Sequence, residues 1–134
     1  MTVVAELQTR VAATAAAAAA PDGSEVRLLC GTIPRQYGAV HPPPGAVARA
    51  ATHRSVDEIW YVLAGQGGIW RRLAEREETI ALTPGVSLNL PVGTWFQFRS
   101  DGTVPLVVLG VTMPPLRGEQ EAVIVPGAWE PTEG

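Results

Sequence analysis

Residues 45–65 read GAVARAATHRSVDEIWYVLAG, and this stretch decides the fold. It begins and ends on glycine, and two short runs rich in apolar residues lie between the glycines. Runs of this length, bounded by turn residues, are typical of β-strands. The stretch therefore predicts two strands, over 46–53 and 58–64, which carry the imidazole of His53 and the carboxylate of Glu58.

The chain from residue 24 onward repeats this pattern of short strands and tight turns. Turn signals rich in Gly, Pro and Asp separate the apolar runs. Further strands are predicted over 26–33, 68–73, 78–82, 87–90, 95–99, 106–112 and 122–125. No interval supports the helices of a βαβ unit, so residues 24–134 are expected to form an all-β, antiparallel jelly-roll barrel.

The N-terminal segment, residues 1–23, has a different pattern. Apolar and small residues recur at three- and four-residue spacing, and a run of alanines follows them. Pro21 and the turn after it would stop a helix at that point. The spacing predicts a short N-terminal helix or leader ahead of the barrel.

The composition excludes several classes of protein. With 134 residues, 46% hydrophobic and 17% charged, the chain is expected to be one folded domain and not a disordered one. A net charge of −3 does not favour binding to nucleic acid or to an anionic membrane. The single cysteine, Cys30, excludes an internal disulfide and favours a cytoplasmic location.

Two glycine-bounded stretches, 45–65 and 85–100, resemble the two motifs of the cupin superfamily. The first family motif is Gly, five residues, His-x-His, three or four residues, Glu, six residues, Gly. The second is Gly, five residues, Pro-x-Gly, two residues, His, three residues, Asn. The positions that match are Gly45, His53, Glu58, Gly65, Gly85, Pro91 and Gly93. The resemblance implies a cupin barrel that binds a small molecule and forms a homodimer.

The departures from the motifs concern the metal ligands. Typical cupins hold a divalent metal with three histidines and one glutamate, but Ala51 and Phe96 stand at two of the histidine positions. Only His53 and Glu58 carry over, and a catalytic metal site normally has at least three protein ligands. Candidates for a third ligand are His41, Cys30, Asn89 and Gln97. We therefore expect either no cofactor or one divalent metal on His53 and Glu58, with His41 as the third ligand.

Alternation of side chains along a strand selects the residues that face the barrel interior. If His53, Glu58 and the ligand position at residue 96 point inward, their neighbours two and four residues away do so too. The expected catalytic residues are His53, Glu58 and Arg49, and the expected substrate-binding residues are Ala51, Trp60, Phe96 and Phe98. An inward Arg49 would pair with Glu58 or with an anionic ligand group, whereas a register shift would place it in water at the rim.

An imidazole and a carboxylate in one apolar cavity are the parts needed for proton transfer. We expect a small-molecule enzyme of the isomerase, cyclase or lyase type. A non-catalytic small-molecule-binding cupin and a metal-dependent, oxygenase-type cupin are the alternatives. Burial and mutual pairing shift the pKa values of His53 and Glu58 in opposite directions, and the sequence leaves open which effect is larger.

Overall fold

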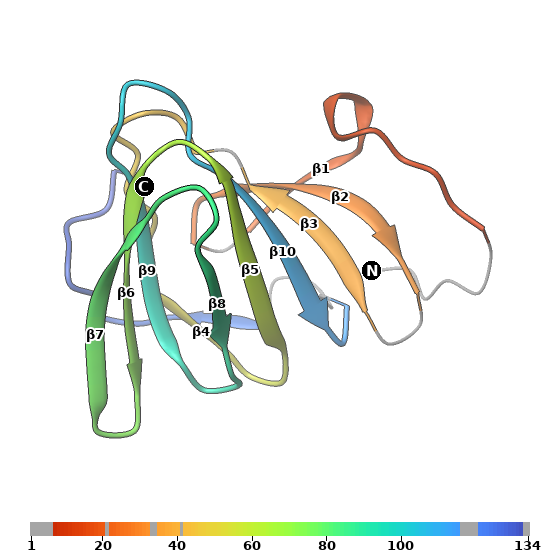
Figure 1. Ribbon diagram of the computed structural model, residues 1–134. Helices are drawn as coiled ribbons and strands as arrows, with labels where there is room; N and C mark the ends of the chain where they lie inside the picture. The colour runs from red at the N-terminus through yellow and green to blue at the C-terminus, as the bar shows by residue number, and fades with distance from the viewer. Residues whose placement is uncertain (1–6, 21, 33–34, 41, 116–120, 133–134) are drawn as a thin grey trace.

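The computed structural model describes residues 7–20, 22–32, 35–40, 42–115 and 121–132. Its strands form two antiparallel sheets (Figure 1). The six-stranded sheet consists, in spatial order, of β1 (Ala17–Ala19), β2 (Glu25–Gly31), β3 (Gln36–Val40), β10 (Val107–Met113), β5 (Asp57–Ala64) and β8 (Ser87–Leu90). The five-stranded sheet consists of β11 (Ala122–Ile124), β4 (Ala51–His53), β9 (Trp95–Ser100), β6 (Gly67–Leu73) and β7 (Arg76–Leu82). The expected all-β jelly roll is confirmed.

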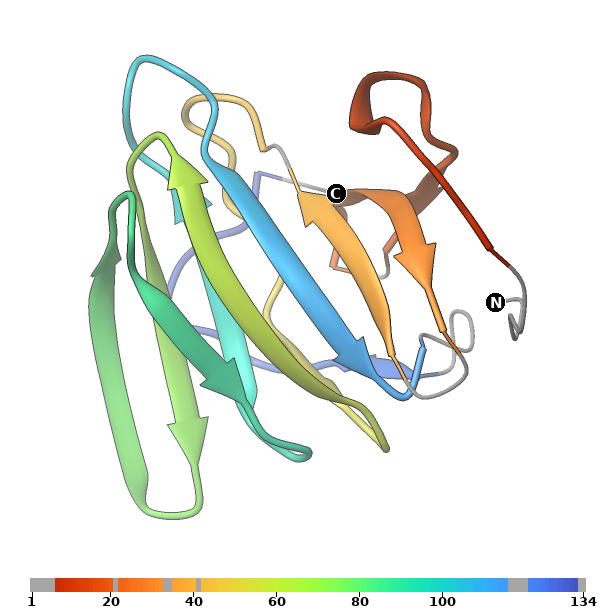
Figure 2. The same ribbon diagram turned by 45° about the vertical axis from the view of Figure 1, so that its right-hand side comes forward.

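The core lies between the two sheets because alternate residues of each strand point inward. In β5 the side chains of Trp60 and Val62 are buried, whereas those of Tyr61 and Leu63 point outward and are about half exposed. Trp60 and Val62 pack in one cluster with Phe96 and other inward residues of β6, β8, β9 and β10. Each such buried side chain contributes about 1.5–3 kcal/mol to folding. Figure 2 shows β3, β10 and β5 lying side by side across the molecule.

Glycines of the two motifs occupy turns that other residues would not fit. Gly65, which ends the first motif, has a φ of 82°. A Cβ atom at this position would lie 2.4 Å from the carbonyl oxygen of Pro105. Gly93 of the second motif also has a positive φ, of 88°. These glycines are therefore required by the backbone path, since L-residues rarely adopt this conformation.

The prediction of an N-terminal helix is wrong for the described part of that segment. A 3-10 turn, η1 (Ala12–Thr14), is followed by β1, which pairs with β2. A short, alanine-rich helix is marginal in water, whereas the edge of β2 offers unpaired main-chain groups. The side chain of Arg10 also donates to the carbonyl oxygen of Leu29 on that strand, at 3.3 Å. No helix in the described ranges is long and apolar enough to cross a membrane.

Two further strand predictions need correction. Strand β3 was not predicted, because Gly38 in its middle and the turn residues before it weaken the strand pattern. The strand expected over 46–53 is shorter: Val47 forms an isolated bridge with Arg99, and regular pairing begins at β4.

Candidate functional site

His53 and Glu58 form a hydrogen-bonded pair that joins the two sheets. His53 is the last residue of β4 and Glu58 is the second residue of β5, and the short turn between them directs both side chains inward. The distance between His53 Nε2 and Glu58 Oε1 is 2.7 Å. The two side chains are only 10% and 11% exposed. The structure therefore brings these two predicted site residues together.

Aromatic side chains enclose this pair. The indole nitrogen of Trp60 donates to Glu58 Oε2 at 2.5 Å. The ring of Phe96 stacks on the imidazole of His53, with 5.9 Å between the ring centroids. Trp60 contacts Phe98 edge to face at 5.2 Å, while Ala51 is buried beside Phe96. Each expected substrate-binding residue thus lies in the interior next to the pair.

The inward position predicted for Arg49 relies on a regular alternation of side chains back from His53, and the structure interrupts that alternation. Ala48 and Ala51 are both buried although they are three residues apart, so the period of two breaks between them. Arg49 itself is half-buried, and its main-chain N–H donates to the carbonyl oxygen of Asp22 at 2.8 Å. Its catalytic role stays a prediction. His41, the expected third metal ligand, lies outside the described residues.

Two carboxylates near His53 were missed by the sequence analysis. Glu121 accepts hydrogen bonds from the main-chain N–H and the hydroxyl of Ser55, at 2.7 and 2.8 Å, and its Oε1 lies 3.7 Å from His53 Nδ1. Asp22 is buried and accepts a hydrogen bond from the hydroxyl of Ser24 at 2.6 Å. Glu121 reaches the site because β11 pairs with β4, and no local motif signals this pairing.

The charges of these groups shift one another's pKa values. Burial lowers the pKa of His53, but the hydrogen bond with Glu58 and the charges of Glu58, Glu121 and Asp22 outweigh burial and raise it above 6.5. Burial raises the pKa of Glu121, yet the hydrogen bonds from Ser55 bring it below 4.5. Burial raises the pKa of Asp22 above 3.8, against the hydrogen bonds from its own turn. His53 therefore holds its proton more firmly than a solvated histidine.

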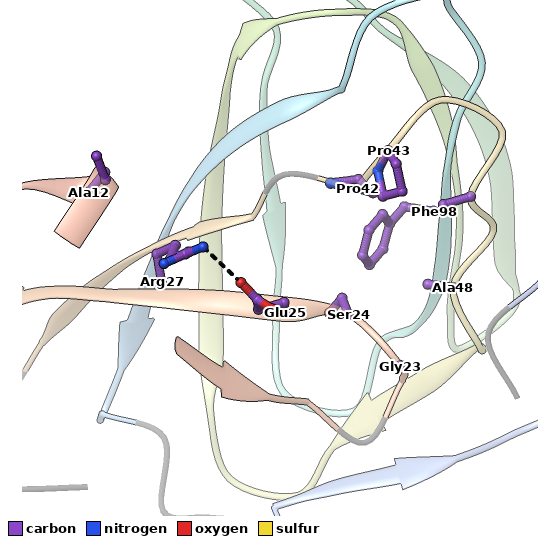
Figure 3. Close-up of a pocket in the computed structure, with 11 residues that line it drawn as sticks. Ala12, Gly23, Ser24, Glu25, Arg27, Pro42, Pro43, Ala48 and Phe98 are labelled. Atoms are coloured by element: carbon purple, nitrogen blue, oxygen red, sulfur yellow. Dashed lines mark ion pairs between the residues drawn. The ribbon is translucent and has the colours of Figure 1, made fainter. Parts of the chain in front are cut away.

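Two cavities lie close to this group of residues. One, of about 540 Å³, opens between the N-terminal segment and the barrel and ends on Phe98 and Ala48 (Figure 3). Arg27 and Glu25 form an ion pair of 3.1 Å at its wall. The other cavity, of about 50 Å³, borders Glu58 itself on the inner face of the six-stranded sheet. Phe98 lines the larger cavity and contacts Trp60, which in turn donates to Glu58.

A comparison with known protein families shows to which family the chain belongs. The family model described as "Cupin domain" matches residues 38–112, which is more than half of the sequence. This chain is a cupin. The match includes both glycine-bounded motifs and the His53–Glu58 pair. No curated protein matches the sequence of this cupin.

Several solved structures share the fold of this cupin. A protein from Bacillus halodurans is 21% identical, with 70% of this chain and 73% of that chain covered and a TM-score of 0.63. KdgF from a Halomonas species is 17% identical, with 81% and 96% covered and a TM-score of 0.67. Oxalate decarboxylase from Bacillus subtilis, described with Mn(II) centres, is 17% identical; 77% of this chain matches 28% of that enzyme, with a TM-score of 0.66. At these identities the likeness shows the fold alone.

The donor atoms in this cupin do not fit a metal centre of the family's usual kind. Both carboxylate oxygens of Glu58 are engaged, one by His53 and the other by Trp60. Ala51 and Phe96 supply no donor atom at the two positions where the family motifs have histidine. Among the residues that the structure describes, no group of three or more His, Cys, Asp or Glu could hold a metal ion. The carboxylate of Glu58 is instead satisfied by its protein neighbours, while the Nδ1 atom of His53 is buried without a hydrogen-bond partner among the described residues.

Proposed function

We propose that this cupin binds a small organic molecule and moves a proton on it with the His53–Glu58 pair, in a reaction of the isomerase, cyclase or lyase type. The observation that carries the proposal is the 2.7 Å hydrogen bond between His53 Nε2 and Glu58 Oε1 inside an aromatic enclosure. Such enclosures with a few converging polar groups are the usual small-molecule sites. That a structural neighbour, oxalate decarboxylase, is an enzyme is consistent with catalysis on this fold.

The two residues have different parts in this proposal. His53, whose pKa is raised, carries the proton and acts as the general acid. Glu58 borders the cavity of about 50 Å³ and accepts a proton there as the general base, on a carboxylate lone pair that its hydrogen bonds with His53 and Trp60 leave free. A cavity of this size holds a few waters or the reacting end of a substrate. Arg49 keeps its predicted role of orienting an anionic or enolate oxygen.

Deuterium exchange tests the proposal without knowledge of the natural substrate. The protein is incubated in D₂O with a panel of small hydroxy, keto and unsaturated carboxylic acids and sugars, and loss of C–H signals is followed by NMR. We expect exchange on at least one compound, reduced about 10²–10⁴-fold in Glu58→Gln. Glu75→Gln, the same change in an exposed turn, serves as the matched control. Equal exchange rates in the two variants would contradict the proposal.

A non-catalytic binding function is the second candidate. It is favoured by the cavity of about 540 Å³, whose lining includes Phe98 but not Glu58. In that case the variant Ala13→Trp, which fills the cavity from its exposed side, should no longer bind the compound. The variant Glu58→Gln should still bind it. No compound would then undergo exchange.

For partners, we infer that a second copy of the chain covers the outer face of the six-stranded sheet. Tyr37, Ile59, Tyr61 and Leu63 on β3 and β5 are 45–51% exposed there. A cavity of about 400 Å³ with a mostly apolar wall adjoins Tyr37 and Ile59 on this face. We propose no nucleic-acid or membrane partner and a cytoplasmic location, on the net charge of −3 and the single cysteine.

A further inference from the structure

A fourth cavity lies among residues of β6, β7 and β8 and of the turn before β9. Its volume is about 300 Å³. The residues around it are Arg71, Leu73, Arg76, Glu78, Asn89, Pro91 and Thr94. None of them lines the three cavities described above or belongs to the His53–Glu58 pair. This cavity therefore needs an explanation of its own.

Arg71 has unused hydrogen-bonding capacity beside this cavity. Its Nη1 donates to the carbonyl oxygen of Asn89 at 3.0 Å, and its Nη2 donates to Glu78 Oε1 at 2.7 Å. A guanidinium has five N–H donors. Its Nε atom is buried and has no hydrogen-bond partner among the described residues. A buried donor without a partner is unfavourable, and in native proteins it is usually satisfied by water, an ion or a ligand.

Thr94 provides a second buried polar group at the same cavity. The residue is 3% exposed, and its hydroxyl has no hydrogen-bond partner among the described residues. It precedes β9 and lies two residues before Phe96, which is the Cα partner of Arg71. Residues two apart on a strand share a face, so Thr94 and Arg71 approach the cavity from neighbouring strands.

The charge around the cavity selects the kind of ligand. Arg71 and Arg76 contribute two positive charges and Glu78 one negative charge, which leaves a formal charge of +1. Both oxygens of Glu78 already face these arginines, at 2.7 and 3.6 Å. The unused groups are therefore mainly donors in a positive surrounding. A guanidinium with free N–H groups suits a planar carboxylate or a phosphate.

We propose that this cavity is a binding site for a small oxyanion, a carboxylate or a phosphate, held by the guanidinium of Arg71 and the hydroxyl of Thr94. The site is separate from the proposed proton-transfer function and stands whether or not that function is correct. A volume of about 300 Å³ suits an anion or a small organic acid.

Titration with two probes tests the site and distinguishes the sources of the anion. Sodium acetate and inorganic phosphate are added separately at constant ionic strength and pH, and the arginine Nε–H signals of the ¹⁵N-labelled protein are followed by NMR. We expect saturable shifts of the Arg71 signal with at least one probe. A response to acetate alone indicates a carboxylate ligand, and a response to phosphate indicates a phosphate ligand. If neither probe gives a saturable shift, the proposal is overturned.

Paired variants separate binding from general charge effects. Affinity in the variants is measured from the main-chain amide signals around the cavity. Arg71→Gln should weaken binding at least about tenfold, because it removes a charged hydrogen-bond donor. Arg72→Gln, the matched control, removes the neighbouring guanidinium, which lies over the ring of Trp95 at 5.3 Å and outside the cavity. Equal affinity in the two variants would overturn the proposal.

A second pair keeps the test valid if Arg71→Gln fails to fold. Thr94→Val is nearly isosteric and should lower the affinity about three- to tenfold, because the ligand loses one hydrogen bond. Thr52→Val is its matched control, since the buried hydroxyl of Thr52 also has no partner within the described part of the chain but does not line the cavity. Unchanged affinity in Thr94→Val would exclude the threonine hydroxyl from the site and contradict the proposal.

Discussion

At the scale of single residues, His53 is governed by the carboxylates around it. An imidazole that is 10% exposed would lose its charge if burial alone acted on it. Here Glu58 lies at 2.7 Å from one ring nitrogen and Glu121 at 3.7 Å from the other. Pairing outweighs burial, so the pKa of His53 is raised and the charged ring is stabilised.

This raised pKa predicts a pH dependence of stability. A group whose pKa is higher in the folded state stabilises the protein fully below its unfolded-state pKa, here 6.5, and loses that effect as the pH rises through the folded-state pKa. We therefore expect the free energy of unfolding in urea to fall as the pH rises above 6.5.

The variant His53→Gln should remove most of this pH dependence. His41→Gln, the same change at the second histidine of the chain, is the control and should retain it. If both variants keep the wild-type slope, the charge on His53 does not stabilise the fold.

Restoring the two missing histidines should create metal affinity. Ala51 and Phe96 are Cα partners on β4 and β9, and the ring of Phe96 lies on His53. The double variant Ala51→His with Phe96→His places three imidazoles beside Glu58, which is a donor set suited to a divalent ion. We expect calorimetry to show Mn²⁺ or Zn²⁺ binding at least tenfold tighter than in wild type or in Ala51→His alone. A folded double variant without this gain would contradict the ligand positions inferred from the motifs.

At the scale of elements, hydrogen bonds from the side chain of one glutamine hold the C-terminal segment against β9. Gln97 points away from the barrel interior and is 1% exposed. Its Nε2 donates to the carbonyl oxygens of Ala48 and Trp129, and its Oε1 accepts from the N–H of Trp129, each at 2.8 Å. One side chain thereby satisfies main-chain groups on two segments that are far apart in the sequence.

Gln97→Leu should release this segment. The change leaves three buried or half-buried main-chain groups without their partner, at about 1–3 kcal/mol for each buried one. We expect a loss of about 3 kcal/mol in unfolding free energy and faster hydrogen exchange at residues 126–132. Gln66→Leu, at an exposed position, is the control and should change neither quantity.

At the scale of the whole molecule, the outer faces of the two sheets differ. The C-terminal segment covers part of β9 through Gln97, whereas apolar side chains of β3 and β5 lie open on the six-stranded sheet. Exposed apolar area of this kind favours association, because its burial removes it from water. This asymmetry is the reason for placing the proposed second copy on the six-stranded sheet.

Tyr61→Arg should therefore change the oligomeric state. We expect the wild type to have twice the chain mass of 14.1 kDa in light scattering coupled to gel filtration, and Tyr61→Arg to be monomeric. An arginine buried against an apolar partner surface would lack a counter-charge. Ile124→Arg places the same charge on an exposed residue of β11 in the five-stranded sheet and should leave the mass unchanged. A monomeric wild type would refute the proposed interface.

The sequence alone predicts the barrel fold and the presence of His53 and Glu58 in its interior. Glycines such as Gly65 mark turns that require a positive φ, and the period of two around Glu58 places Trp60 and Val62 in the core. These signals are local, because a turn and a strand face depend on residues close in the chain. Both motifs also carry a resemblance whose fold the family match and the neighbours confirm.

Only the tertiary structure decided the features that depend on contacts between residues far apart in the sequence. The alanine run became an edge strand because β2 lies beside it, and Glu121 reached His53 because β11 pairs with β4. The alternation that predicted an inward Arg49 broke because the chain leaves regular pairing before β4. The upward shift of the His53 pKa also depends on three separate segments, which carry the carboxylates of Glu58, Glu121 and Asp22. Strand periodicity and turn geometry depend on residues that are neighbours in the sequence, so the sequence alone predicts them. Which segments meet in space determines the hydrogen bonds between distant strands and the electrostatic interactions across the interior.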